Sequence, residues 1–269
     1  MNKLIKGPFA VLMTPFVDGK LDQVSFVKQV KRVNGTGVSG FVTNGSTAEF
    51  VQLSLEEQML VTELVAKNKD YDKKLIVSAC TGNAVDTLTL AKHAKSVGAD
   101  AILVCPPYYF KYTQKEREEY FITVADKSPV PVILYNIPFF TQELELDVIY
   151  RLFNHKNIIG IKDSSANMKR IMHLIDVWGK DKSIMTGTDD ILTSALFAGC
   201  DGSLTALACI FPDKVADLYR HFANGEIDKA RDIQTQFMSV TRKADSKTFP
   251  FGYKELMSEV SGIPMGNKE

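Results

Sequence analysis

The stretches VILYN at residues 132–136 and IIGIK at residues 158–162 show how this chain is built. Each is a short apolar run of the kind that forms a buried strand, and the segment between them is long enough for one helix. The same unit recurs along the chain, so we expect strands at residues 9–15, 38–44, 75–81, 101–105, 132–136, 158–162, 184–187 and 202–206. Strands that alternate with helices form parallel sheets, and this many units predict a closed (β/α)8 TIM barrel of the α/β class.

The segments between the expected strands carry the start signals of helices. Residues 54–57 and 113–116 each fit the capping box, in which a hydroxyl and a carboxylate satisfy the free amides of the first helical turn. We expect a single domain, with the barrel core at residues 1–210. Residues 211–269 should supply the last barrel helix and a short C-terminal helical extension, with helices at 212–224 and 227–242.

The composition argues against several classes of function. The chain has 269 residues with 32 acidic and 32 basic side chains, which gives no support for a nucleic-acid partner or a membrane partner. No run approaches the ~18 apolar residues that a membrane span needs. The N-terminus lacks the apolar core of a secretion signal, and the four cysteines form no CxxC pattern, so we expect reduced thiols in a cytoplasmic protein. The four histidines show no i, i+4 pairing, which predicts no metal site.

Lys162 is the most informative single residue, because it ends the apolar run that begins at Ile158. Burial at the mouth of a strand disfavours the charged form of an amine. A neutral amine attacks a ketone and forms an imine, and a nearby phenol can move the protons that this step requires. Tyr135 follows the preceding apolar run, so the two residues together indicate Schiff-base carbonyl chemistry.

The active site of a (β/α)8 barrel forms at the C-terminal ends of its strands. The candidates at those ends are Ser46, Thr47, Tyr109, Tyr135, Lys162, Gly187, Asp189, Asp190, Leu204 and Thr205. Several also have a plainer explanation: Lys162 paired with Asp163, Tyr135 as a core residue, or Asp189 and Asp190 as caps of a helix that begins at Ile191. Their convergence on one rim favours a functional pocket.

Three motifs at this rim resemble those of a known family. Residues 45–49 read GSTAE, residues 135–138 read YNIP and residues 160–164 read GIKDS, in the order and spacing of the dihydrodipicolinate synthase / N-acetylneuraminate lyase family. The likeness runs from about Gly7 to about Pro212. This family consists of class I aldolases and related lyases on a (β/α)8 barrel. The resemblance implies a metal-independent lyase that needs no cofactor and takes pyruvate or another 2-keto acid.

The resemblance implies a role for the motif residues. Lys162 is expected to form the imine with the keto acid, and Tyr135 to move protons on and off the carbinolamine and the aldol oxygen. Ser46 and Thr47 are expected to hold the keto acid carboxylate through backbone amides and hydroxyls.

Further positions also match the family. Thr47 is expected to link Tyr135 to a second tyrosine, Tyr109, which in relatives reaches in from the neighbouring subunit. The match therefore implies a homo-oligomer, a dimer or a tetramer, with Tyr109 near an interface. Gly187 and Leu204 match positions that line the pyruvate end of the pocket.

Two positions depart from the family pattern. Ala48 stands where the family usually has glycine, which costs of order 1 kcal/mol if the position needs a positive φ. Phe139 and Phe140 follow the YNIP motif, whereas dihydrodipicolinate synthases carry an arginine two residues past the proline, where it grips the carboxylate of the second substrate. A phenyl ring cannot make that bidentate contact, so Phe140 should disfavour aspartate semialdehyde.

The aldehyde end of the expected pocket favours a hydroxylated substrate. Asp189 and Asp190 are similar to the acidic pair that binds hydroxyls in sialic acid lyases, and carboxylates accept hydrogen bonds from sugar hydroxyls. Phe140 and Thr205 are expected to lie beside this pair. We therefore expect an aldolase that cleaves a 2-keto-3-deoxy sugar acid into pyruvate and an aldehyde, or forms it from them. The alternatives are a 4-hydroxy-tetrahydrodipicolinate synthase that condenses pyruvate with aspartate semialdehyde, a dehydratase acting on the same imine, and a keto acid binding homologue without turnover.

Overall fold

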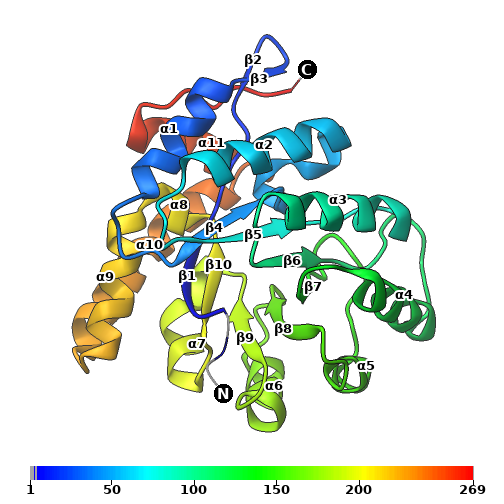
Figure 1. Cartoon of the computed structure of the whole chain (residues 1–269). Coiled ribbons are helices and arrows are strands. Elements are labelled where there is room, and N and C mark those ends of the chain that lie inside the picture. The colour runs from blue at the N-terminus through cyan, green and yellow to red at the C-terminus, as the bar shows by residue number, and fades with distance from the viewer. Residues whose placement is uncertain (1–2, 4, 269) are drawn as a thin grey trace.

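The protein folds into a closed barrel of parallel strands, seen in a computed structural model that describes residue 3 and residues 5–268 (Figure 1). The barrel strands are β1 (Gly7–Val11), β4 (Gly40–Thr43), β5 (Lys74–Ser78), β6 (Ala101–Val104), β7 (Val132–Asn136), β8 (Ile158–Asp163), β9 (Ser183–Thr186) and β10 (Gly202–Thr205). They pair in the order β1-β10-β9-β8-β7-β6-β5-β4, and β1 closes the barrel against β4. Every expected strand is present near its predicted bounds, which confirms the (β/α)8 TIM barrel.

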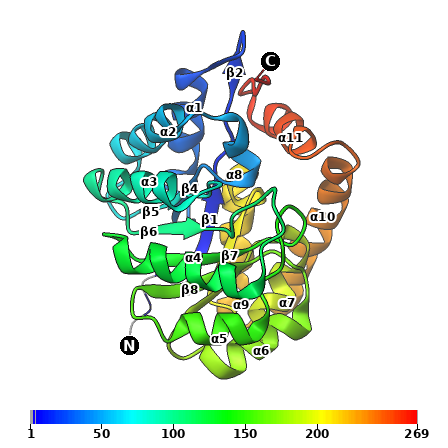
Figure 2. The same ribbon diagram turned by 90° about the vertical axis from the view of Figure 1, so that its right-hand side faces the viewer.

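Helices form the outer layer around these strands (Figures 1 and 2). They are α1 (Gln23–Val33), α2 (Leu55–Asn68), α3 (Ala84–Ser96), α4 (Gln114–Lys127), α5 (Leu146–Phe153), α6 (Met168–Trp178) and α7 (Leu192–Ala198). Both predicted capping boxes are confirmed: Ser54 accepts from the amide of Glu57, Thr113 accepts from the amide of Glu116, and each glutamate bonds back to the cap amide.

Alternation along the strands divides the buried side chains into two layers. In β1, Phe9 and Val11 belong to the cluster inside the barrel, whereas Ala10 belongs to the cluster between barrel and helices. In β7, Ile133 and Tyr135 likewise belong to the inner cluster. Side chains two residues apart share one face of a strand, so this alternation determines which residues at the strand ends face the barrel mouth.

The C-terminal quarter of the chain is more helical than predicted. The expected helices at 212–224 and 227–242 are present as α9 (Pro212–Ala223) and α10 (Ile227–Asp245), preceded by the short α8 (Leu207–Ile210). A further helix, α11 (Phe251–Ser261), was missed. Pro250 and Gly252 break the helical pattern at its start, and Gly252 is needed there because a Cβ would collide with the backbone of Ala244 in α10.

The C-terminal end of the chain lies beside the small hairpin formed by β2 (Phe16–Val17) and β3 (Lys20–Leu21) (Figure 2). The amide of Phe16 donates to the carbonyl of Met265 at 3.1 Å, which ties the tail to this hairpin. Within residues 3 and 5–268, no helix combines the length and apolarity that a membrane crossing requires.

Candidate active site

Lys162 and Tyr135 lie side by side at the barrel mouth because β7 and β8 pair in register at these two residues. The Nζ atom of Lys162 lies 3.2 Å from the phenolic oxygen of Tyr135 and 4.4 Å from the centroid of its ring. Lys162 is 4% exposed and Tyr135 is 2% exposed. The barrel thus holds an amine and a phenol within hydrogen-bonding distance and away from bulk water.

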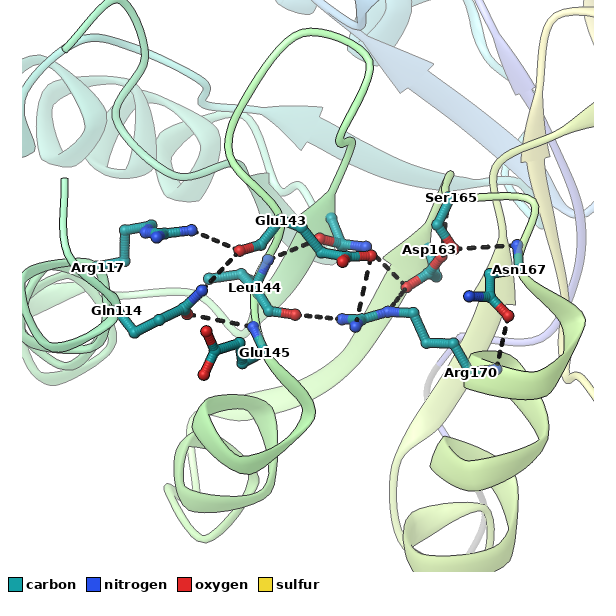
Figure 3. A network of polar contacts seen from close by, with 10 residues as sticks. Gln114, Arg117, Glu143, Leu144, Glu145, Asp163, Ser165, Asn167 and Arg170 are labelled. Atoms are coloured by element: carbon teal, nitrogen blue, oxygen red, sulfur yellow. Dashed lines mark hydrogen bonds and ion pairs between the residues drawn. The ribbon is translucent and has the colours of Figure 1, made fainter. Parts of the chain in front are cut away.

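The alternative that Lys162 pairs with Asp163 is wrong. The side chain of Asp163 is fully buried, and its carboxylate accepts from Nε of Arg170 at 2.8 Å and from Nδ2 of Asn136 at 2.9 Å. Successive residues of a strand face opposite sides, so Asp163 is directed to the helix layer while Lys162 faces the barrel mouth. Arg170 comes from α6 and meets Asp163 at the end of β8 (Figure 3).

The same polar network holds the loop between β7 and α5 in place (Figure 3). Arg170 donates to the carbonyl of Leu144 at 2.5 Å, and the amide of Leu144 donates to Oδ1 of Asn136 at 3.0 Å. On the other side, Arg117 and Gln114 of α4 donate to the carbonyl of Glu143 at 2.5 and 3.0 Å. The end of this loop, which follows both phenylalanines of the altered motif, is therefore held between α4 and α6.

Ser46 and Thr47 lie in the short 3-10 helix η1 (Ser46–Ala48), and a second one, η2 (Phe50–Gln52), follows directly. The hydroxyl of Ser46 lies 3.3 Å from the phenolic oxygen of Tyr135, so Ser46 rather than Thr47 contacts the phenol within this chain. Ala48 is not left-handed; Glu49 takes that conformation instead, with φ 58°. The alanine in place of glycine is therefore harmless.

A cavity of about 460 Å³ opens above Lys162 at this end of the barrel. The predicted site residues that line it are Ser46, Thr47, Tyr135, Phe140, Lys162, Gly187, Asp189, Asp190, Leu204 and Thr205. Among the described residues of its lining, Lys162 carries the one cationic side chain. The strand ends thus converge on one pocket, as the topology of the barrel requires.

Hydroxyl groups in this cavity are left for a ligand. Thr47 and Ser164 both line it, and the Oγ atom of each is buried without a hydrogen-bond partner among residues 3 and 5–268. Buried hydroxyls normally have a partner. Their position around Lys162 therefore suits a polar molecule that accepts hydrogen bonds beside the amine.

Gly187 is required by the close approach of Lys162. A Cβ at this position would lie 2.5 Å from Cε of Lys162, and it would also collide with the side chain of Ser164. A side chain at this position would therefore push the Lys162 side chain out of its observed place.

The two adjacent aspartates have different surroundings. Asp189 is buried, and burial raises its pKa to about 7, opposed by hydrogen bonding with the Thr205 side chain and by a hydrogen bond from the amide of Leu207 at 3.2 Å. Asp190 is exposed at the cavity edge. The alternative that this pair caps the helix at Ile191 is wrong, because α7 begins at Leu192 without a side-chain cap. In the described part of the chain, no group of three or more His, Cys, Asp and Glu side chains is placed to hold a metal ion.

A single chain does not bring Tyr109 to the cavity. Its side chain is 91% exposed, its φ is 80°, and its ring lies edge-on against Phe110 with centroids 5.1 Å apart. Tyr109 therefore neither lines this cavity nor contacts Lys162 within its own chain.

The C-terminal helices supply part of the cavity wall that the sequence did not reveal. Asp245, Phe249 and Tyr253 line it from α10, α11 and the link between them. Tyr253 donates to Asp245 at 2.9 Å, and the ring of Phe249 lies 5.2 Å from that of Phe140. The aromatic run FPFGY at residues 249–253 was the available signal, since such clusters are unusual in a solvated helical extension.

This site combines a buried lysine, an adjacent phenol and unpartnered hydroxyls at the mouth of a (β/α)8 barrel. These are the groups that a class I aldolase requires. Comparison with protein families agrees with this class. The model of the Dihydrodipicolinate synthetase family matches residues 4–268, and the chain belongs to this family. It is thus a lyase of the pyruvate-dependent class I aldolase type.

Individual relatives cover almost the same length. The 4-hydroxy-tetrahydrodipicolinate synthase of Methanothrix thermoacetophila is 31% identical over 93% of this chain and 85% of its own length. The synthase of Thermodesulfovibrio yellowstonii is 32% identical, with coverage of 97% and 90%. Among solved structures, YagE, a prophage protein of the dihydrodipicolinic acid synthase family from E. coli K12 in complex with pyruvate, is 29% identical with a TM-score of 0.89, covering 94% of this chain and 88% of its own.

Proposed function

We propose that Lys162 forms an imine with C2 of pyruvate, and that the protein cleaves or forms a 2-keto-3-deoxy sugar acid. The observation that carries the chemistry is the 3.2 Å separation between the Lys162 amine and the Tyr135 phenol. The amine adds to the keto carbon and gives a carbinolamine. Tyr135 donates its proton to the carbinolamine hydroxyl, which leaves as water, and the protonated imine remains.

The protonated imine then accepts the electrons of the bond that breaks. In the cleavage direction, the Tyr135 phenolate takes the proton of the C4 hydroxyl, the C3–C4 bond breaks, and the aldehyde leaves. The electron pair of that bond forms an enamine on Lys162. Protonation of the enamine at C3 and addition of water to the imine release pyruvate and restore the amine.

The turn at η1 suits the carboxylate of the keto acid. Ser46 and Thr47 line the cavity, and the unpartnered hydroxyl of Thr47 can donate to an anion there. With the keto carbon at Lys162 and the carboxylate at this turn, the remaining chain of the substrate points toward η3 (Asp189–Ile191) and the C-terminal helices.

The far end of the cavity supports a hydroxylated aldehyde. Asp189, Asp190 and Asp245 line it, and no lysine or arginine besides Lys162 is present among the described lining residues. A carboxylate on the aldehyde half would meet the carboxylates of Asp190 and Asp245, whereas hydroxyls would donate to these acceptors. Phe140 and Phe249 add aromatic faces that the C–H groups of an open-chain aldehyde can contact.

The second candidate is 4-hydroxy-tetrahydrodipicolinate synthase, acting on pyruvate and aspartate semialdehyde. The comparisons favour it over the sugar acid, because the relatives described above carry that name. The pocket gives it less support, because Phe140 occupies the place expected for the arginine that grips the second carboxylate.

We also propose that the working enzyme is a homo-oligomer in which Tyr109 completes the site of a second copy. Tyr109 is almost fully exposed, and a second cavity of about 240 Å³ borders Ser46 and Tyr135 beside Tyr108. A ring entering this cavity from another copy would reach Ser46 and Tyr135, which line it. Sedimentation velocity should show at least a dimer, and Tyr109→Phe should lower activity without dissociating it.

Substrate turnover separates the two candidates. Pyruvate released from a panel of 2-keto-3-deoxy sugar acids can be measured with lactate dehydrogenase and NADH, with Lys162→Ala as the inactive control. We expect release from at least one sugar acid at a rate above condensation with aspartate semialdehyde. Faster condensation with aspartate semialdehyde would refute the sugar-acid function and establish the synthase.

A further inference from the structure

A buried ion pair joins the C-terminal helix α11 to the turn that carries Ser46 and Thr47. The Nζ atom of Lys254 in α11 lies 2.5 Å from Oε1 of Glu49, and both side chains are almost fully buried. Glu49 separates η1 from η2 and directly follows the proposed carboxylate site. The partners are 205 residues apart in the chain, so the last helix of the protein reaches its first site motif.

The surroundings of the pair make Glu49 depend on Lys254. Nζ of Lys254 lies 4.8 Å from the ring centroid of Phe16, and burial lowers the pKa of this lysine while Glu49 opposes the shift. The second carboxylate oxygen of Glu49 is buried and accepts no hydrogen bond from residues 3 and 5–268. A buried carboxylate without its counter-charge is strongly unfavourable, so loss of the lysine should drive Glu49 toward solvent.

The turn has little structure of its own to resist such a movement. Both 3-10 helices are only three residues long, and helices of this kind depend on contacts with the rest of the protein. Glu49 holds a left-handed backbone that is costly for a residue with a side chain. Side-chain hydrogen bonds to the carbonyls of this turn are few: Thr14 donates to Ala48 and Lys268 to Gln52, each at 2.7 Å, and Gln58 donates to Phe50 and Leu53, each at 3.3 Å.

We infer that Lys254 is a positioning residue: by holding Glu49, it keeps Ser46 and Thr47 where the carboxylate of the keto acid binds. This rests on the proposed function, since it requires pyruvate at the turn. The amide of Glu49 donates to the carbonyl of Ser46 at 3.0 Å, so a displacement of Glu49 moves the carboxylate site itself. Lys254 does not line the main cavity, and its effect is therefore exerted through Glu49.

Lys254→Met removes the charge and keeps most of the length of the side chain. We expect the pyruvate concentration that half-saturates borohydride trapping of the imine to rise by about 10-fold or more, because small misplacements of binding groups have effects of this size. The trapping rate at saturating pyruvate should change much less. Lys243→Met is the matched control, because it removes an exposed lysine of α10 that pairs with Glu259 at 2.8 Å.

A double variant tests the role of Glu49. Lys254→Met combined with Glu49→Gln leaves no unpaired buried charge, so the side chain at residue 49 is no longer driven to solvent, and both Tm and half-saturation should return toward those of the unaltered protein. A raised half-saturation in Lys254→Met that is fully folded by circular dichroism at the assay temperature, with recovery in the double variant, supports the inference. Normal half-saturation in folded Lys254→Met, or a value that stays raised in the double variant while its Tm recovers, overturns it. Absence of any pyruvate adduct in the unaltered protein would refute the proposed function, and the inference with it.

Discussion

Replacing Tyr135 with phenylalanine should stop proton transfer and leave the barrel intact. The phenolic oxygen lies 3.2 Å from the amine of Lys162 and 3.3 Å from the hydroxyl of Ser46, while the ring packs inside the barrel. The ring remains in Tyr135→Phe, so the lost hydrogen bonding should lower the free energy of unfolding by only about 1 kcal/mol. Loss of the acid–base group should slow the reaction ~10²-fold or more, which corresponds to about 2.7 kcal/mol or more of activation free energy.

The exchange of pyruvate methyl protons with D₂O, followed by ¹H NMR, measures this effect without knowledge of the aldehyde. Exchange requires formation of the imine and its conversion to the enamine, and both steps need proton transfer. Tyr219→Phe is the matched control, because its hydroxyl donates to Ser203 at 2.9 Å and does not line the cavity. Exchange near the normal rate in Tyr135→Phe, or an equal loss in Tyr219→Phe, would refute the reasoning.

Three further substitutions test other parts of the site. Gly187→Ala places a Cβ 2.5 Å from Cε of Lys162, so borohydride trapping of pyruvate should fall while circular dichroism keeps the barrel signature. Phe140→Arg should raise the rate of condensation with aspartate semialdehyde by about 10-fold or more, whereas Phe139→Arg should not. Equal effects of the two substitutions would argue against Phe140 as the position that faces the second carboxylate. Burial raises the pKa of Asp189 from 3.8 to about 7, so the folded protein binds this proton more tightly than the unfolded chain. The free energy of unfolding should therefore fall as pH rises between these values. Urea denaturation at several pH values should show a smaller fall in the free energy of unfolding for Asp189→Asn.

The barrel and the inner half of the site could be predicted because both depend on local signals. Apolar runs of strand length gave the strands, and the alternation of faces places Tyr135 and Lys162 inside the mouth. The same alternation explains the error over Asp163. An adjacent residue in a strand faces the other side, so its partner is Arg170 of α6.

Little of the outer half of the site could be predicted, because it depends on contacts between distant segments. Asp245, Phe249 and Tyr253 reach the cavity only because α10 and α11 fold back over the barrel mouth. A proline and a glycine at the start of α11 interrupt the apolar period from which a helix is predicted. The pairing of Lys254 with Glu49 likewise has no sequence signal, since a lone lysine in a helix is usually solvated.

Borohydride trapping with pyruvate, followed by intact mass and peptide mapping, tests the imine on Lys162. The amine lies buried beside Tyr135 in a cavity with unpartnered hydroxyls, so we expect a single reduced pyruvate adduct per chain, located on Lys162. Lys162→Ala should keep its fold by circular dichroism and form no adduct. An adduct on another lysine, or none in a folded sample of the unaltered protein, would contradict the proposed mechanism.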